Sequence, residues 1–365
     1  MRDWYRGALA PAAAGLAALL LAACGSSSPG GAAATPSPVD VGSASLQGAG
    51  STFVQPFFQK AFYQYNLDHS SVSINYQGVG SGAGIQQFSA GTVDFGATDV
   101  PMKASEIATA GGASTLIQIP DALGAVAIAY NLPGLDKLKL DGPTLGDIYL
   151  GKVKTWNDPE IAALNSGVTL PSTNISVVHR SDGSGTSYIF TDYLSKVSQT
   201  WASGPGVGKA VNWPTGTGAK GTAGVAGVIT QTAGAIGYVE LAYVVQTGMH
   251  QAWIKNKSGN YLQASVKGAT QAAGQASGLS ATNFSITDES GNSSYPIAGY
   301  TWALIRTSIS DPQKAKALVY LFKWLVTDGQ SLGASLQYSA LPSSAQNYAI
   351  TQLKTVQSGG SAVLK

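Results

Sequence analysis

The fold is decided by one stretch of sequence, His179-Arg180-Ser181-Asp182-Gly183-Ser184-Gly185-Thr186-Ser187. Residues 175–178 before it are mostly β-branched and predict a buried strand, while apolar residues at 188–194 recur at helical spacing. We therefore expect a tight turn between a strand and a helix. The first backbone N–H groups of such a helix have no partner within it.

A turn of this kind is suited to holding an anion. The N-terminus of a helix carries partial positive charge, which attracts an anion. Gly183 and Gly185 in this turn allow a ligand to approach the backbone closely. Ser184 and Thr186 add hydroxyl donors, and Arg180 adds a permanent charge whose planar fork matches an oxyanion. Asp182 is placed to hold the guanidinium from behind. An ordinary capped Gly/Ser turn is the alternative interpretation.

Three earlier stretches have the same character. The first, Gly48-Ala-Gly-Ser-Thr-Phe53, precedes a helix expected to start close to Thr52. The second, Gly78-Val-Gly-Ser-Gly-Ala-Gly84, contributes the hydroxyl of Ser81, and its spacing does not fit the dinucleotide-binding fingerprint G-x-G-x-x-G. In the third, a strand ends at Asp99. Ligands of α/β proteins gather at such strand ends.

Predicted strands and helices alternate along most of the chain, which favours an α/β fold with parallel strands. We predict strands at 72–76, 93–98, 116–119, 125–130, 175–178, 235–239 and 301–305. We predict helices from Thr52 and from Pro312, and at 85–90, 145–150, 160–164, 188–194 and 225–231. Residues 204–224 are glycine-rich and expected to be irregular, and residues 256–292 are weakly patterned.

The N-terminus is predicted to be a targeting segment. Two arginines precede an apolar run, Ala8 to Leu21, that is too short to cross a bilayer comfortably. Leu21-Ala-Ala-Cys-Gly25 then resembles the lipobox of bacterial lipoproteins, which are cut before the cysteine and carry lipid on it. Residues 1–23 would be the signal peptide, Cys24 the lipidated residue, and 24–45 a flexible tether. Two or more acyl chains would anchor the protein stably.

Composition narrows the classes of function. The 365 residues suggest about two domains with enough core to fold without disulfides, and the chain has a single cysteine. A net charge of +2, with no cluster of Lys or Arg, excludes a strongly basic nucleic-acid binder. The three histidines and one cysteine form no metal-ligand spacing.

Taken together, these stretches resemble the phosphate-binding lipoproteins of bacterial high-affinity phosphate ABC transporters. The resemblance runs from about Leu46 to near the C-terminus. Further stretches that carry it are Thr144-Leu-Gly-Asp-Ile-Tyr-Leu-Gly151, Gly234-Ala-Ile-Gly-Tyr-Val-Glu240 and Tyr338-Ser-Ala-Leu-Pro342. The order in which all of these stretches occur makes the resemblance specific.

The resemblance implies an α/β, two-lobed, periplasmic-binding-protein-like (type II) fold with a hinge and a central ligand cleft. Lobe 1 would comprise 46–122 plus 298–365 and lobe 2 residues 123–297, with crossings near 120–125 and 295–299. Such a protein is an extracytoplasmic receptor and not an enzyme. It needs no cofactor, is held to the cell membrane by lipid, and hands phosphate to the permease and ATPase subunits of an importer.

The resemblance also assigns roles to single residues. Asp99 would accept a hydrogen bond from the proton of phosphate, and Asp182 would orient Arg180, the one cationic side chain. The remaining phosphate contacts would be hydrogen-bond donors, from backbone or hydroxyl groups: Thr52, Phe53, Ser81, Ser184, Gly185 and Thr186. This sequence departs from the family pattern directly after Ser81, where Gly82-Ala83 replaces the more usual Ser-Gly.

The expected binding residues can in principle select phosphate over another tetrahedral anion. Fixed neutral donors with one arginine can replace the water around a divalent anion. A carboxylate beside an anion is repulsive unless a proton lies between them. Phosphate keeps a proton near neutral pH and sulfate does not. Asp99 can therefore discriminate between two otherwise similar tetrahedral ions.

Other functions compete with this one. A receptor for another oxyanion such as sulfate is the nearest, and a surface adhesin or sensor with the same fold is another. A secreted hydrolase would use Ser184 with His179 and Asp182. No G-x-S-x-G elbow surrounds Ser184, and His179 alternates with Arg180 on a strand, so the two side chains should point to opposite faces.

Overall fold

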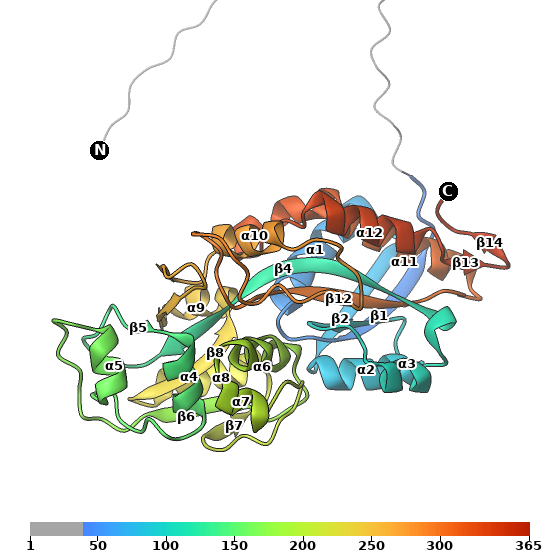
Figure 1. Ribbon diagram of the computed structural model, residues 1–365. Coiled ribbons are helices and arrows are strands. Elements are labelled where there is room, and N and C mark those ends of the chain that lie inside the picture. Colours follow the sequence, from blue (N-terminus) through green and yellow to red (C-terminus); the bar gives the residue numbers. More distant parts are fainter. Residues whose placement is uncertain (1–38) are drawn as a thin grey trace, which may run out of the picture. The chain divides into compact units, whose positions relative to one another are not determined.

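The computed structural model describes residues 39–365, of which 41–365 form one compact unit. Its main element is a curled nine-stranded sheet with helices packed against it (Figure 1). The predicted α/β class is confirmed. The predicted signal peptide, Cys24 and most of the tether lie outside the described residues.

Eight strands make up the main path of the sheet, and β9 joins it at one side. Their order is β2 (Val72–Gly78), β1 (Ala44–Gly50), β3 (Phe95–Thr98), β12 (Ala298–Arg306), β4 (Leu116–Tyr130), β8 (Ala235–Glu240), β6 (Ser176–Arg180) and β7 (Thr217–Ala219), with β9 (His250–Gln251) paired to β4. Small sheets contain β5 (Lys139–Leu140), β10 (Trp253–Lys255), β11 (Tyr261–Leu262), β13 (Gln357–Ser358) and β14 (Ser361–Ala362).

The helices follow the predicted pattern in most places. They are α1 (Gln55–Asp68), α2 (Ser81–Ser89), α3 (Ala104–Thr109), α4 (Gly142–Tyr149), α5 (Pro159–Leu164), α6 (Gly185–Val197), α7 (Gln199–Ser203), α8 (Gly221–Gln231), α9 (Leu241–Thr247), α10 (Val266–Gln275), α11 (Pro312–Val326) and α12 (Ser343–Leu353). Short 3₁₀ turns are η1 (Ala113–Thr115), η2 (Asp328–Leu332) and η3 (Ala334–Leu336).

The two strands predicted at 116–119 and 125–130 are one continuous strand, β4, so the predicted break between them is wrong. β12 pairs along the first part of β4 and β8 along the second, so neighbouring strands support its backbone throughout. The register shifts between Thr301 and Trp302, where Asp121 is the extra residue of a β-bulge and accepts a hydrogen bond from the Thr301 hydroxyl. Asp121 is therefore accommodated within the strand.

The sheet is mixed, which corrects the expectation of a parallel sheet. β1 is parallel to both β2 and β3, and β6 is parallel to both β7 and β8. β12 is antiparallel to β3 and β4, and β4 is antiparallel to β8. Strand–helix alternation predicts the parallel pairs. It says nothing of the direction in which β12, from near the C-terminus, is inserted between β3 and β4.

The mixed topology divides the sheet into two halves joined by β4 and β12 (Figure 1). We call β2, β1 and β3, with the turns that follow them, the first half, and β8, β6 and β7 with their turns the second half. β4 pairs with β12 along its first part and with β8 along its second, so its backbone runs from one half to the other, and the chain returns to the first half through β12. No helix among residues 39–365 is long and apolar enough to cross a bilayer.

Local signals set several element ends correctly and two incorrectly. α11 begins at Pro312 as predicted, and Asp311 caps it, its carboxylate accepting from the backbone N–H groups of Gln313 and Lys314. The helix expected from Thr52 begins at Gln55 instead, although the Ser51 hydroxyl accepts from the N–H groups of Phe53 and Val54 as a helix cap does. β1 begins at Ala44, inside the predicted tether, because it pairs there with β2.

Helix α10 lies in the stretch 256–292, which sequence patterning left without regular structure. Its buried face consists of small residues, Gly268, Ala269, Ala272 and Ala273, which give little hydrophobic contrast. By contrast, the aromatic residues of α1 recur at helical spacing and are buried, and Phe58 packs against Phe62, Tyr76, Phe95 and Phe322. The hydrophobic core of the first half therefore forms around a strong sequence signal.

Candidate anion-binding site

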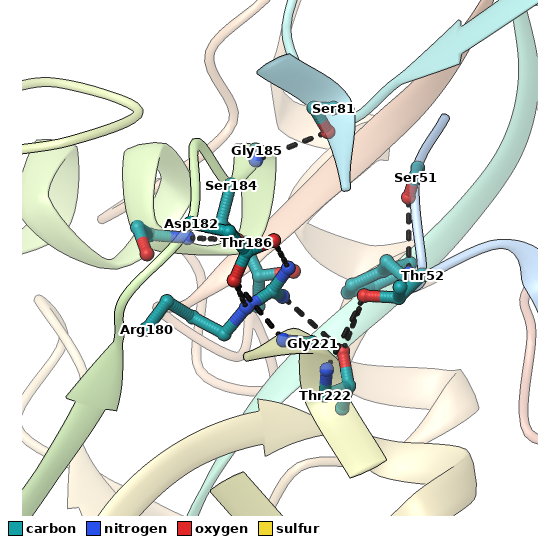
Figure 2. Close-up of polar contacts among 12 residues, drawn as sticks. Ser51, Thr52, Ser81, Arg180, Asp182, Ser184, Gly185, Thr186, Gly221 and Thr222 are labelled. Carbon is teal, nitrogen blue, oxygen red and sulfur yellow. Dashed lines mark hydrogen bonds and ion pairs between the residues drawn. The ribbon is translucent and has the colours of Figure 1, made fainter. Parts of the chain in front are cut away.

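The predicted site residues follow four strands, one of which is β2, which leads into Ser81. β1 leads into Ser51 and Thr52, and β3 leads into Asp99, both in the first half. β6 ends at Arg180 in the second half, and the turn after it leads into α6. Figure 2 shows Ser51, Thr52 and Ser81 of the first half facing Arg180 and the turn 182–186 of the second half. Apart from Asp182, which is partly buried, these polar residues are buried.

Asp99 is held at the centre by two hydroxyl groups. Ser51 donates to its Oδ1, and Thr186 donates to its Oδ2 at 3.1 Å. Asp99 is only 3% exposed. Burial raises the pKa of Asp99 to about 6, and the hydrogen bond from Ser51, the charge of Arg180 and the hydrogen bond from Thr186 keep it from rising further. Asp99 therefore ionises close to physiological pH.

Ser81 joins the two halves through its hydroxyl oxygen. Ser81 Oγ accepts from the backbone N–H of Gly185 at 3.1 Å and from that of Asp99 at 3.3 Å. Beside it, the N–H of Gly82 donates to the carbonyl of Gly183 at 2.8 Å. Because Ser81 Oγ accepts from N–H groups, its own hydroxyl hydrogen remains available to a ligand.

Arg180, which is buried, and Asp182, which is partly buried, form an ion pair with two hydrogen bonds. Arg180 Nε lies 2.8 Å from Asp182 Oδ1, and Nη2 lies 2.5 Å from Oδ2 (Figure 2). Asp182 Oδ1 also accepts from the N–H of Gly221 at 3.0 Å. Burial alone would raise the pKa of Asp182, but the hydrogen bonds and charge of Arg180 lower it below its usual value. The pair fixes the guanidinium and leaves Nη1 directed away from Asp182.

Two of the expected donors are engaged in capping in this structure. Ser184 Oγ accepts from the N–H of Ser187 at 3.1 Å and so caps α6. The N–H of Phe53 donates to Ser51 Oγ at 3.0 Å. The hydroxyl of Ser51 belongs to the first of the glycine-rich stretches, Gly48 to Phe53. Its link between Phe53 and Asp99 depends on the approach of β1 to β3, which local sequence does not reveal.

His179 lies away from this site, as the strand alternation predicted. Its ring stacks on Trp213, with 4.8 Å between ring centroids and an angle of 13° between planes. Its Nδ1 lies 3.0 Å from the backbone carbonyl oxygen of Arg180. The three residues of the hydrolase alternative are therefore not brought together, because Asp182 pairs with Arg180 and Ser184 caps a helix.

Comparison with known proteins places the chain in a family. A sequence model of the PBP superfamily domain matches residues 32–328. The "Phosphate-binding protein PstS" of Xylella fastidiosa is 41% identical over 322 residues, which cover 87% of each chain. The protein of the same name from Pasteurella multocida is 42% identical over 301 residues, which cover 81% of this chain and 86% of that one. The chain belongs to the PstS family.

Solved structures agree on the fold. A phosphate-binding protein from Stenotrophomonas maltophilia has a TM-score of 0.65 at 17% identity, covering 85% of this chain and 94% of that one. A phosphate ABC transporter substrate-binding protein with bound phosphate, from Clostridium perfringens, has a TM-score of 0.60 at 18% identity, covering 82% and 100%. The predicted periplasmic-binding-protein-like fold of this PstS-family chain is thereby confirmed.

Sequence reasoning missed three residues at the site of this PstS-family chain. Gly221 and Thr222 lie in the glycine-rich stretch that was expected to be irregular, yet they follow β7 and begin α8, which repeats the strand–glycine–helix pattern. Glu240 ends β8 and is buried, and burial, followed by the charge of Asp99, raises its pKa well above the usual value. Its burial therefore disfavours the charged form of Glu240 beside the site.

Proposed function

We propose that this chain is an extracytoplasmic receptor that binds inorganic phosphate between the two halves and delivers it to the permease and ATPase subunits of an ABC importer. The observation that carries the proposal is the hydrogen-bonded cluster around the buried carboxyl group of Asp99, which joins hydroxyl and N–H groups from both halves. The charge of Arg180 acts on this carboxyl group, whose pKa is about 6. The names of its relatives support phosphate as the ligand.

The donor set matches an anion that carries one proton. Arg180 Nη1 and the hydroxyl hydrogens of Ser81 and Ser184 are donors, whereas an ionised Asp99 can only accept. The proposed contacts are those expected from the sequence: Thr52, Phe53, Ser81, Asp99, Arg180, Ser184, Gly185 and Thr186, with Asp182 behind Arg180. The N–H groups of Phe53 and Gly185 would exchange their present partners, Ser51 and Ser81, for phosphate oxygens.

The proposed role is binding without turnover. No serine of the site lies against a histidine, and the relatives are named as binding proteins. Titration of the purified mature chain with phosphate in a calorimeter tests the proposal, with saturation at one phosphate per chain as the expected result. Hydrolysis of a chromogenic phosphate ester by the same preparation would favour the hydrolase instead.

We further propose that the halves belong to two lobes, 46–122 plus 298–365 and 123–297, that close on the ligand. Contacts across the site support this division: Ser81 with Gly185, and the ion pair of Glu106 and Lys209 at 2.7 Å. β4 and β12 are the segments that would bend, because they connect the halves. A receptor for another oxyanion would close in the same way.

Phosphate is expected to reduce the radius of gyration of the chain. Donors divided between two lobes can all reach one small anion only after the lobes have approached each other. Small-angle X-ray scattering with and without phosphate measures the change, and the Arg180→Ala variant, which should not bind, serves as the control. An identical radius of gyration in both conditions would contradict lobe closure.

Replacement of Cys24 by serine is expected to release the protein from the membrane without changing its affinity for phosphate. The expectation rests on the lipobox-like run at 21–25 and the short apolar segment before it. Cell fractionation followed by a high-salt wash measures the distribution. Retention of the Cys24→Ser variant in the washed membrane fraction would show that the anchor is elsewhere.

A further inference from the structure

Thr222, the second residue of α8, contacts both a site residue of the first half and the cation of the second half. Its Oγ1 lies 3.0 Å from Thr52 Oγ1 and 3.4 Å from Arg180 Nη1 (Figure 2). The backbone N–H of Thr222 donates to Thr52 Oγ1 at 3.3 Å. Thr222 is 1% exposed, so water does not compete for these hydrogen bonds.

The direction of the hydrogen bonds follows from which groups can only donate. Arg180 Nη1 has no acceptor capacity, so the oxygen of Thr222 accepts there. The hydroxyl hydrogen of Thr222 is then free to donate to Thr52 Oγ1, which also accepts from the N–H of Thr222. With its oxygen accepting twice, Thr52 directs its own hydroxyl hydrogen away from Thr222.

We propose that Thr222 is a positioning residue for the bound anion. It forms the middle of a relay in which Arg180 donates to Thr222, Thr222 to Thr52, and Thr52 to the anion. The positive charge of the guanidinium polarises each hydroxyl in turn and makes Thr52 a better donor. This inference rests on the proposed function, because it concerns the same anion.

The relay connects the two halves, because Thr52 follows β1 and Thr222 follows β7. It is complete only while the halves are in contact. Loss of the Thr222 hydroxyl should therefore shorten the time for which the anion stays bound, with little effect on its rate of entry. The expected increase in the dissociation rate is about five- to tenfold, the usual effect of one hydrogen bond.

The test compares Thr222→Val, which keeps the shape and the N–H but lacks the hydroxyl, with Thr222→Ser, which keeps the hydroxyl. Stopped-flow measurements give phosphate association and dissociation rates, and thermal unfolding without phosphate reports stability. The matched control is Thr191→Val, since Thr191 is another buried threonine of the second half whose hydroxyl bonds to the carbonyls of Tyr188 and Gly208.

We expect Thr222→Val to release phosphate faster, and Thr222→Ser and Thr191→Val to release it as the wild type does. If Thr222→Val releases phosphate at the wild-type rate, the role of Thr222 is wrong while the proposed function stands. The same holds if Thr222→Val and Thr222→Ser increase the dissociation rate equally. Absence of phosphate binding in the wild type would overturn the proposed function as well. If Thr222→Val fails to fold, the dissociation rate of Thr222→Ala is measured instead, and the same outcomes support or contradict the inference.

A double-mutant cycle with Thr52→Val provides a second measurement. If Thr222 acts through the Thr52 hydroxyl, the two substitutions will not be additive, and Thr222→Val will weaken binding much less in the Thr52→Val background. Full additivity of the two losses would overturn the relay, since it would mean that Thr222 acts independently of Thr52.

Discussion

Replacing Arg180 by alanine is expected to weaken phosphate binding by at least about a hundredfold. Arg180 is the one cation of the proposed site, and hydrogen bonds to charged groups contribute about 1.5–3 kcal/mol each. Loss of two such bonds corresponds to roughly a hundredfold or more in the dissociation constant. The variant also leaves the carboxylate of Asp182 without its ion-pair partner, close to where the anion would sit.

Calorimetric titration of Arg180→Ala measures the loss, and two further variants separate its causes. The double variant Arg180→Ala/Asp182→Asn removes the residual negative charge and should recover only part of the affinity. Arg306→Ala is the control for loss of an arginine, because the guanidinium of Arg306 donates to the backbone carbonyls of Phe88 and Ala110. If the dissociation constant of Arg180→Ala lies within about threefold of the wild-type value, Arg180 does not bind the anion. A tenfold change in the dissociation constant corresponds to about 1.4 kcal/mol, so a threefold change is smaller than the loss of one hydrogen bond to a charged group.

Replacing Asp99 by asparagine is expected to let sulfate bind while weakening phosphate only modestly. Ionised Asp99 can only accept, so against sulfate it would face an oxygen that has no hydrogen to share. A site built to bond a group that the wrong ligand lacks rejects that ligand strongly, typically by about 10⁴–10⁵-fold. Asparagine supplies a donor and removes the charge, and its amide can still bond to the hydroxyls of Ser51 and Thr186.

The pKa of Asp99 gives this experiment an internal check. Burial raises that pKa to about 6, so the carboxyl group is increasingly protonated as the pH falls below 6 and can then donate a hydrogen bond. Wild type should therefore accept sulfate progressively better between pH 7 and pH 5, over which sulfate itself stays fully ionised. Asp99→Asn should bind sulfate equally well at both pH values. If the variant rejects sulfate as wild type does at pH 7, Asp99 is not the proton acceptor.

The sequence predicts the local parts of this fold well because their signals are local. Asp311 before Pro312 begins a helix through its own side chain, and the β-branched run before Arg180 forms a strand. β4 could not be predicted as one strand, because the residues that interrupt its apolar pattern are supported by β12, about 180 residues further along the chain. The antiparallel insertion of β12 has no local signal either.

Individual residues of the site could be predicted only where they lie in a recognisable sequence motif. Ser81, Asp99, Arg180 and Thr186 each lie in a glycine-rich turn or at a strand end, and the structure brings them together. Thr222 was missed because the strand before it, β7, is only three residues long and lies in a glycine-rich stretch. Glu240 ends a stretch that carries the resemblance, but the sequence assigned it no role at the site. Their positions at the site come from the pairing of β7 and β8 with β6, which depends on the whole sheet.

Competition between labelled phosphate and sulfate for the wild-type chain at about pH 8, well above the pKa of Asp99, tests the central claim most directly. The measurement reports both the binding of phosphate and its discrimination from an ion of the same shape. We predict that phosphate saturates one site per chain and that about a thousandfold excess of sulfate leaves it bound. Displacement of phosphate by an equal concentration of sulfate, or no binding of phosphate at all, would contradict the account.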